Sequence, residues 1–406
     1  MAAGRSTLSA DHRPGAPKRV ERGNMGLMSQ AMESSEGQKQ PRVWVLVSDR
    51  AGDDAQSETL AGALGWPHQA KRVHFTGGNH FHHRIFGPSL RHVDLARSDT
   101  LEPPWPDLVI ASGRRQIAVS LWIREQSGGC SKLVQLGRPQ ADLRLFDLVV
   151  STAQYRLPDA ANVLNLELPL MRGGNPEEID AAAARLAPSL ESYARPWTAL
   201  MVGGPAVPYV LDAEAARQLV AQSASVIERD GGSLFVVTSP RTPRTVADAL
   251  EQGTPPGGYF YRWSPGSADN PYKGLLGLSD RFIVTGDSVS MMVEVVRQGK
   301  PLAIARLPEQ PSWRARWRRL LNDALFRPPA ARPGDGSIPR ALGECLHSLG
   351  FLSFSRDLGA FHGLLIGRGS AVYLGSPFVA PVAPPVDGLP LAVARIREIS
   401  FLDIQG

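Results

Sequence analysis

The residues best placed for ligand chemistry follow an apolar run at Phe282–Val284, in a turn of small residues. The turn consists of Thr285, Gly286, Asp287 and Ser288. A helical pattern follows over about residues 289–298, so unpaired amides and a positive dipole at its start predict a seat for a phosphate group. Because Asp287 is itself anionic, we expect it to cap the helix or to contact a sugar hydroxyl. The simpler interpretation is a helix cap that binds no ligand.

Three more residues around this motif suit a nucleotide. Glu294 lies two turns into the predicted helix, where its carboxylate is able to accept hydrogen bonds from a pair of ribose hydroxyls. Upstream, Asn270 and Tyr272 offer an amide and an aromatic ring that suit a nucleobase. The plainer interpretation is a solvated Glu294 and a helix that begins at Pro271.

Two turns follow strands predicted at residues 199–202 and 233–238. The first contains Gly203 and Gly204, which let the backbone closely approach a pyrophosphate or the acceptor. The second contains Ser239 and Arg241, whose hydroxyl and guanidinium are typical phosphate ligands. Each is equally compatible with an ordinary turn. Since ligands bind at the carboxyl ends of parallel strands, we expect a nucleotide site where these turns meet.

An acidic turn follows the first apolar run, Val43–Val47. It contains three candidate bases, Asp49, Asp53 and Asp54, any of which would deprotonate an acceptor hydroxyl in a transfer reaction. Gly52 and Gln56 stand among them and are candidate acceptor contacts. Acidic loop residues also serve as helix caps, which is the structural alternative.

Glycine and arginine recur at two further strand ends of the first half. Gly113 and Arg114 follow a strand predicted at residues 108–111, and Arg138 follows another at residues 133–136. Arginines at adjacent strand ends predict a positive cleft for a phosphorylated or lipid-linked acceptor. The alternative is a pair of exposed arginines.

These motifs depend on elements that bring strand ends together. From Arg42 onward, apolar runs of strand length alternate with stretches of helical length, a pattern that predicts βαβ units and a parallel sheet. In the first half we expect strands at residues 43–47, 108–111, 133–136, 148–150 and 163–165. The series restarts after Pro196, with strands expected at residues 199–202, 233–238, 259–262, 282–284 and 301–305.

Two such series predict an α/β chain with two facing Rossmann-like domains. A closed (β/α)8 barrel remains possible on strand number, but the helical stretch at residues 179–194 and the second glycine-rich start at Gly203 and Gly204 favour two separate sheets. The expected parts are a disordered polar tail at 1–40, an acceptor domain at 41–195, a nucleotide-sugar donor domain at 196–325, and an irregular excursion with a C-terminal helix and tail at 326–406.

The run from Thr285 to Pro301 resembles the donor-binding turn of GT-B glycosyltransferases. In that family a small-residue turn leads into a helix whose glutamate stands five residues before a Gly-x-Pro, the spacing of Glu294 and Gly299. With Asn-Pro-Tyr upstream, residues 42–307 are similar more narrowly to the mitochondrial fission "elongated mitochondria" family. The resemblance implies a GT-B fold and a nucleotide-sugar donor substrate. It also implies sugar transfer, without metal or cofactor, to a cell-envelope or lipid-linked acceptor.

The sequence departs from the fission-family pattern at two strand ends. That pattern has a proline and a His-Asp pair after the strand at 148–150, and Gly-Ala-x-His after the next strand. Here residues 151–155 read Ser-Thr-Ala-Gln-Tyr and residues 165–169 read Asn-Leu-Glu-Leu-Pro. The departures favour a different acceptor or a loss of turnover, so a non-catalytic adaptor or membrane-recruitment protein is the second hypothesis. A dinucleotide-dependent epimerase or dehydrogenase is disfavoured, because no Gly-x-Gly-x-x-Gly follows the first strand.

Composition narrows the setting of the protein. The net charge is +5, carried mainly by arginine, and the two cysteines are Cys130 and Cys345. Few cysteines and no apolar run of about 20 residues predict a cytoplasmic protein. The basic charge by itself does not distinguish nucleic acid, phospholipid and phosphorylated ligands, and the partner that we expect is a nucleotide sugar, with no nucleic acid. The run Trp313–Phe326 predicts an amphipathic helix that packs between domains or lies on the inner face of an anionic membrane. Histidines between His74 and His92 lack metal-ligand spacing, so no metal site is predicted.

Overall fold

A computed structural model gives the fold. It describes residues 40–48, 51–76, 87–171, 175–267, 269–310, 313–326, 341–343, 345–346 and 356–401. The tail predicted at residues 1–40 therefore lies outside the described residues, apart from Gln40. So do Asp49 and most of the histidine-rich stretch.

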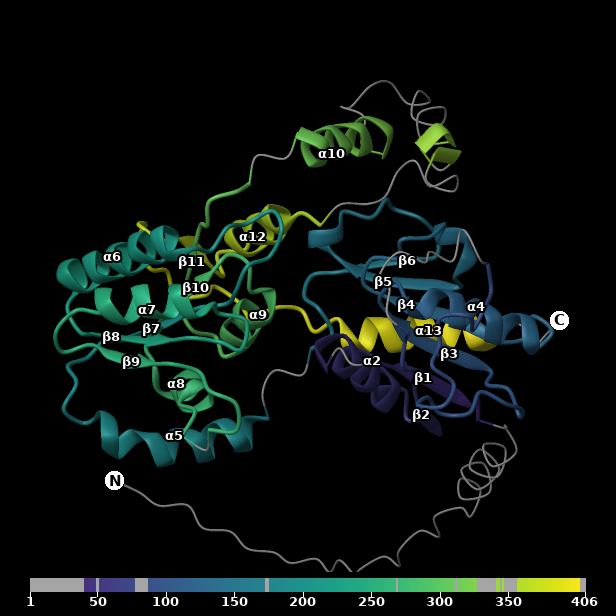
Figure 1. Ribbon diagram of the computed structural model, residues 1–406, viewed down its shortest axis with the longest axis horizontal. Helices are drawn as coiled ribbons and strands as arrows, with labels where there is room; N and C mark the ends of the chain where they lie inside the picture. The colour runs from purple at the N-terminus through teal and green to yellow at the C-terminus, as the bar shows by residue number, and fades with distance from the viewer. Residues whose placement is uncertain are drawn as a thin grey trace, which may run out of the picture. The chain divides into compact units, whose positions relative to one another are not determined.

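The first half of the chain forms one six-stranded parallel sheet with the spatial order β2-β1-β3-β4-β5-β6 (Figure 1). In chain order its strands are β1 (Val43–Val47), β2 (His68–Arg72), β3 (Leu108–Ser112), β4 (Lys132–Leu136), β5 (Leu148–Thr152) and β6 (Val163–Leu166). The five predicted strands are confirmed. The edge strand β2 was not predicted, because its sequence HQAKR is mostly exposed and lacks the apolar run of a central strand.

The second half forms another six-stranded parallel sheet, in the order β12-β11-β10-β7-β8-β9. In chain order its strands are β7 (Trp197–Met201), β8 (Ser233–Val237), β9 (Tyr259–Tyr261), β10 (Arg281–Thr285), β11 (Leu302–Ala305) and β12 (Val372–Tyr373). The two-residue β12 is the only one of these that was not predicted. The predicted α/β class with two Rossmann-like sheets is therefore confirmed.

Helices connect these parallel strands and cover both faces of each sheet. They are α2 (Ala51–Leu64), α4 (Gln116–Gln126), α5 (Pro176–Leu190), α6 (Ala213–Asp230), α7 (Arg244–Gly253), α8 (Tyr272–Leu278), α9 (Val289–Arg297), α10 (Trp313–Phe326), α12 (Leu358–Gly367) and α13 (Leu389–Phe401). Short 3-10 turns lie at η1 (Leu143–Leu145) and η2 (Ala153–Tyr155). Among the described residues, none of these helices is long and apolar enough to cross a bilayer.

Alternate side chains of each strand enter different cores, as strand geometry requires. In β7, Ala199 and Met201 face α9 and α12, whereas Leu200 faces α6 and α7. Both faces are covered, which explains why the central strands read as unbroken apolar runs.

The last two described helices belong to different sheets. Phe361 of α12 is fully buried in the core of the second sheet. Ala392 and Ile396 of α13 are fully buried in the core of the first sheet, beside α2 (Figure 1, yellow). The predicted excursion and tail at 326–406 therefore supplies core elements to both sheets.

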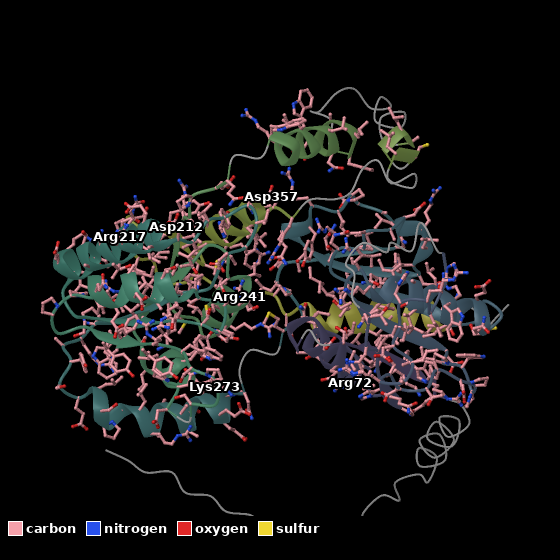
Figure 2. All side chains as sticks on the ribbon, in the orientation of Figure 1. Arg72, Asp212, Arg217, Arg241, Lys273 and Asp357 are labelled. Carbon is pink, nitrogen blue, oxygen red and sulfur yellow. The ribbon has the colours of Figure 1, made fainter. Side chains whose placement is uncertain are left out.

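Helix α5 supports the part of the second sheet that bears the predicted nucleotide site. A Cβ at Gly274 of α8 would lie 2.7 Å from Leu186 Cδ2 of α5, so glycine permits this close helix contact. Lys273, labelled in Figure 2, pairs with Glu178 of α5. The contact fixes α8, which carries Tyr272.

Candidate functional site

Each sheet has a topological switch point, where the connections on either side leave in opposite directions. In the second sheet it lies between β7 and β10, and in the first between β1 and β3. Ligands of doubly wound sheets bind at the carboxyl ends of the strands at such points. Among the predicted turns, those after β7, β10, β1 and β3 lie at these two places, and those after β8 and β4 lie one strand away.

The turns after β7, β8 and β10 form one hydrogen-bonded network. The Gly203 amide donates to Thr285 Oγ1 over 2.9 Å, and the Gly204 amide donates to Asp287 Oδ2 over 3.0 Å. Arg241 Nη2 donates to the same Asp287 oxygen over 3.0 Å (Figure 2 labels Arg241). The structure thus brings the predicted residues of three separate turns together.

The two glycines are required by this network. A Cβ on Gly203 would lie 2.3 Å from Asp287 Oδ2, and a Cβ on Gly204 would lie 2.3 Å from the Arg241 carbonyl oxygen. The backbone is closely approached at both glycines. In this structure the approaching groups belong to other turns of the same chain, Asp287 at Gly203 and the Arg241 backbone at Gly204.

Two hydroxyls complete the turn after β8. Ser239 Oγ donates to the Gly203 carbonyl over 3.0 Å, and Thr242 Oγ1 donates to the same oxygen over 2.6 Å. Ser239 is 7% exposed. In this structure it holds the Gly203 turn in place.

The start of α9 differs from the prediction in its cap. Ser288 occupies the N-cap position without a side-chain cap bond, and the Asp287 carboxylate bonds to Gly204 and Arg241 instead of the helix. The predicted cap by Asp287 is therefore wrong, because the neighbouring turn competes for the Asp287 carboxylate. Asp287 Oδ1 is buried and has no hydrogen-bond partner among the described residues.

The turn at residues 285–288 is so buried that a phosphate group would have little access to it. Thr285, Asp287 and Ser288 are at most 4% exposed. Exposure begins one residue into the helix, where Val289 and the exposed Ser290 line a large pocket. The amides of the first turn of α9 have no carbonyl within the helix to bond. The part of this motif that borders open space is therefore the first helical turn, and Gly286–Ser288 supports it from below.

His362 of α12 holds the same turn from the other side. Its Nε2 donates to the Gly286 carbonyl over 2.8 Å, and its ring stacks on Tyr209 at a centroid separation of 6.2 Å. Burial lowers the pKa of His362, and the bond to Gly286 opposes that shift. No sequence motif pointed to His362, since it lies 76 positions from its partner.

Glu294 is joined to Tyr272 in a link between α8 and α9. The Tyr272 hydroxyl donates to Glu294 Oε2. Burial raises the pKa of the Glu294 carboxyl above its ordinary value, and the hydrogen bond from Tyr272 offsets part of that rise. Asn270 Oδ1 accepts from the Tyr272 amide over 3.0 Å at the start of α8. Tyr272 and Asn270 thus position the carboxylate and the helix in this structure.

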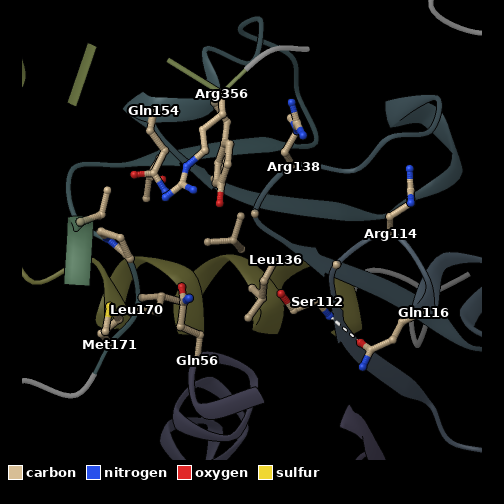
Figure 3. Close-up of a pocket in the computed structure, with 18 of the residues that line it drawn as sticks. Gln56, Ser112, Arg114, Gln116, Leu136, Arg138, Gln154, Leu170, Met171 and Arg356 are labelled. Carbon is tan, nitrogen blue, oxygen red and sulfur yellow. Dashed lines mark hydrogen bonds between the residues drawn. The ribbon is translucent and has the colours of Figure 1, made fainter. Parts of the chain in front are cut away.

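A pocket of about 530 Å³ opens at the carboxyl edge of the first sheet (Figure 3). Gln56, Gly113, Arg114 and Arg138, all predicted as acceptor contacts, line it together. Val289 and Ser290 of α9 line it as well. The structure therefore groups these four residues around one cavity.

The three candidate bases are in different situations. Asp54 is 9% exposed, and its two carboxylate oxygens accept from the Ser48 amide, each over 3.0 Å. In this structure it fixes the turn after β1. Asp49 lies outside the described residues, and Gly52 and Asp53 lie in the first turn of α2 with their surroundings undescribed.

The pocket wall also contains residues that were not predicted. Ser151, Thr152 and Gln154 come from β5 and η2, at one of the strand ends where the sequence departs from the family pattern. The rule that singled out the other strand ends would have found them. Arg356 had no such signal. It is brought to the pocket by its neighbour Asp357, whose amide donates to the Gln154 carbonyl over 2.6 Å and whose Oδ2 accepts from Arg156 Nη1 over 2.8 Å.

No group of three or more His, Cys, Asp or Glu side chains among the described residues could hold a metal ion. The pocket lining that the structure describes contains four arginines, and the start of α9, with the amides of its first turn, borders the same pocket. The candidate site is therefore suited to anionic ligands.

The two sheets and their switch points define a two-domain α/β protein of the doubly wound class. The chain belongs to the mitochondrial fission ELM1 family, whose model matches residues 51–344.

Two curated relatives are similar in sequence. The mitochondrial fission protein ELM1 of Arabidopsis thaliana is 29% identical over 233 residues, and the match spans 52% of this chain and about half (54%) of that protein. An uncharacterized protein, RP120, of Rickettsia prowazekii (strain Madrid E) is 23% identical over 300 residues, covering 64% of this chain and 82% of its own length.

Solved structures with a similar backbone trace include one bacterial and one archaeal protein. A glycosyltransferase from Rickettsia africae ESF-5 has a TM-score of 0.42 at 12% identity and covers 91% of this chain and 100% of its own. A UDP-GlcNAc 2-epimerase from Methanocaldococcus jannaschii has a TM-score of 0.46 at 10% identity, with coverages of 89% and 99%. These likenesses add nothing to what the sheets themselves show.

Proposed function

We propose that this protein is a GT-B-like glycosyltransferase that uses a nucleotide sugar as donor. The nucleotide binds at the switch point of the second sheet, with its diphosphate at the first turn of α9 and its ribose at Glu294. The sugar passes to a cell-envelope or lipid-linked acceptor in the pocket of the first sheet.

One observation carries the proposal: Ser290 and Glu294 are four residues apart on α9, and Ser290 lines the pocket. Side chains four apart lie on the same helix face. A diphosphate at the free amides and a ribose one turn further along the helix fit this spacing. The sugar would then extend toward the pocket that contains the predicted acceptor residues.

The same arrangement supports a reaction without a metal ion. As the bond between sugar and diphosphate breaks, negative charge grows on the leaving diphosphate. The positive end of α9 and nearby guanidinium groups stabilise that charge where it develops. No cofactor is needed, because the donor supplies the activated sugar.

Calorimetric titration of the full chain with UDP, GDP and CMP, and with their sugars, tests donor binding. We expect at least one nucleotide to bind, and Glu294→Ala to weaken it by about tenfold or more, as for a lost hydrogen bond to a charged group. Glu125→Ala, an exposed glutamate on α4, is the matched control and leaves affinity unchanged. The donor proposal fails if no nucleotide binds, or if both variants bind as the wild type does.

A non-catalytic adaptor is the second candidate, and one observation favours it. No carboxylate or histidine is among the described residues that line the pocket, and Asp54 is held by the Ser48 amide. A base would then have to come from Asp49 or Asp53. Release of nucleoside diphosphate, as the sugar passes from the nucleotide to an added phosphorylated acceptor or to water, separates the two candidates. Release that stops in Asp53→Asn supports the transferase, and binding with no release supports the adaptor.

We also propose a peripheral contact with the inner face of a membrane through α10. Trp313 and Trp317 are 69% and 65% exposed, and arginines alternate with them in the sequence. Exposed tryptophans beside basic residues are typical of helices that lie on anionic lipid. Co-sedimentation with vesicles containing anionic lipid should fall when both tryptophans are changed to serine. The contact is excluded if the amount of protein that co-sediments is the same with and without anionic lipid in the vesicles.

A further inference from the structure

The pocket of the first sheet carries positive charge on several sides. Its described lining includes four arginines, Arg114, Arg115, Arg138 and Arg356, and no aspartate or glutamate. Arg114 and Arg138 are half-buried, and Figure 3 shows both beside the cavity with Arg356. A pocket with this charge favours an anion, and guanidinium groups suit phosphate in particular because they present paired donors.

The part of the pocket wall at the end of β5 consists of polar side chains with unmade hydrogen bonds. Ser151, Thr152 and Gln154 are 1%, 5% and 4% exposed. Within the part of the chain that the structure describes, Ser151 Oγ, Thr152 Oγ1 and Gln154 Oε1 are all buried without a hydrogen-bond partner. Buried polar atoms almost always have hydrogen-bond partners, and a hydrogen bond left unmade in the interior is unfavourable.

The unpartnered atoms are close to the cavity. All three residues line it, and so does Gln116, whose Nε2 is also buried without a partner. Hydroxyl and amide groups of this kind recognise the hydroxyls of a sugar or another polyol. The pocket volume of about 530 Å³ lies in the range of small-molecule sites.

We propose that this pocket binds a sugar phosphate or another phosphate-bearing polyol, with the phosphate at the arginines and hydroxyls at Ser151, Thr152 and Gln154. This inference rests on the proposed function, since it names the chemical class of the acceptor. The phosphate is carried either by a free sugar phosphate or by a lipid-linked one. Both present the same group to the arginines.

The test is titration of the full chain with three probes. They are glucose 1-phosphate, uncharged methyl glucoside, and polyprenyl phosphoglucose in neutral detergent micelles. We expect a phosphate-bearing probe to bind, with an affinity that falls as salt rises, and methyl glucoside to bind at least tenfold more weakly. Preference for glucose 1-phosphate identifies a free acceptor, and preference for polyprenyl phosphoglucose identifies a lipid-linked one.

Two variants locate the binding. Arg138→Ala should weaken binding of the phosphate probe by about tenfold or more. Gln56→Glu should weaken that binding by a similar factor, because the substitution adds a carboxylate of the same size to the pocket wall. Arg144→Ala is the matched control, since Arg144 is exposed and pairs with Asp142 outside the pocket lining. Melting curves confirm that each variant is folded.

The inference is overturned if neither phosphate probe binds, if methyl glucoside binds equally well, or if Arg138→Ala and Gln56→Glu both bind as the wild type does. Its failure is distinguishable from failure of the donor proposal. Glu294→Gln should leave the phosphate probe unaffected, and a nucleotide that still binds while the phosphate probes do not removes only the acceptor assignment.

Discussion

At the scale of single residues, the structure separates side chains that build the site from those that face a ligand. Asp287 and His362 are both buried, and they hold the Gly204 and Gly286 turns from opposite sides. Ser290 and Arg138 border the pocket. A buried residue of the first kind should affect the stability of the turn before it affects any ligand contact.

His362 provides a pH-dependent test of this role. Its pKa is lowered by burial, so the folded protein keeps it neutral at pH values where the unfolded chain protonates it. Unfolding therefore takes up a proton as pH falls below about 6.5, and the free energy of unfolding decreases by at most about 1.4 kcal/mol per pH unit from this group.

Urea unfolding at pH 7.5 and 5.5 measures the effect. We expect the loss of stability between the two values to be smaller in His362→Gln than in the wild type. An equal loss in both proteins would show that His362 does not titrate differently on folding.

Residue types were easier to predict than their partners. Gly203 and Gly204 were identified as positions of close backbone approach, and the structure has that approach. A pyrophosphate or the acceptor was predicted to approach them, and that stays a prediction; the groups that approach them in the structure are Asp287 and the Arg241 backbone. Sequence patterns indicate that a glycine is needed, but the atom that approaches it depends on contacts more than 30 residues away.

At the scale of elements, the packing of the turns onto one another is the feature that is most sensitive to substitution. Gly204→Ala places a methyl group against the Arg241 backbone, so we expect the free energy of unfolding to fall by about 1–3 kcal/mol. Nucleotide affinity should fall with it, because the turn supports α9.

Gly363→Ala is the control for that variant. Gly363 is exposed in the middle of α12, and a Cβ added there would have no other atom within 4 Å, so alanine should stabilise the helix by about 0.5–1 kcal/mol. Chemical denaturation measures both changes. Equal effects of the two substitutions would contradict the close packing of the Gly204 turn.

The strands that were predicted differ physically from those that were not. Central strands such as β3 and β10 are buried on both faces and read as apolar runs. The edge strand β2 has one buried residue out of five, and β12 has only two residues. Hydrophobic periodicity reports burial, so it does not detect strands whose sides face solvent.

At the scale of the whole chain, the C-terminal helix α13 returns to the first sheet after the second has been completed. Ile396 is fully buried there, whereas Leu391 on the same helix is 53% exposed. Ile396→Ala should lower the free energy of unfolding by about 2–5 kcal/mol, and Leu391→Ala should change it by less than about 0.5 kcal/mol.

Thermal or urea unfolding of the two variants checks this placement. Similar effects of both substitutions would contradict the burial of α13 in the first core. The return was not predictable from sequence, because the apolar pattern of residues 389–401 indicates a helix without indicating which core it joins.

The proposed function depends on a nucleotide diphosphate that binds at the first turn of α9. A crystal structure of the full chain with a nucleoside diphosphate tests this most directly. We expect phosphate oxygens to accept hydrogen bonds from the amides at Val289–Met291 and the ribose to lie within hydrogen-bonding distance of Glu294. A nucleotide bound elsewhere, or none bound at millimolar concentration, would contradict it.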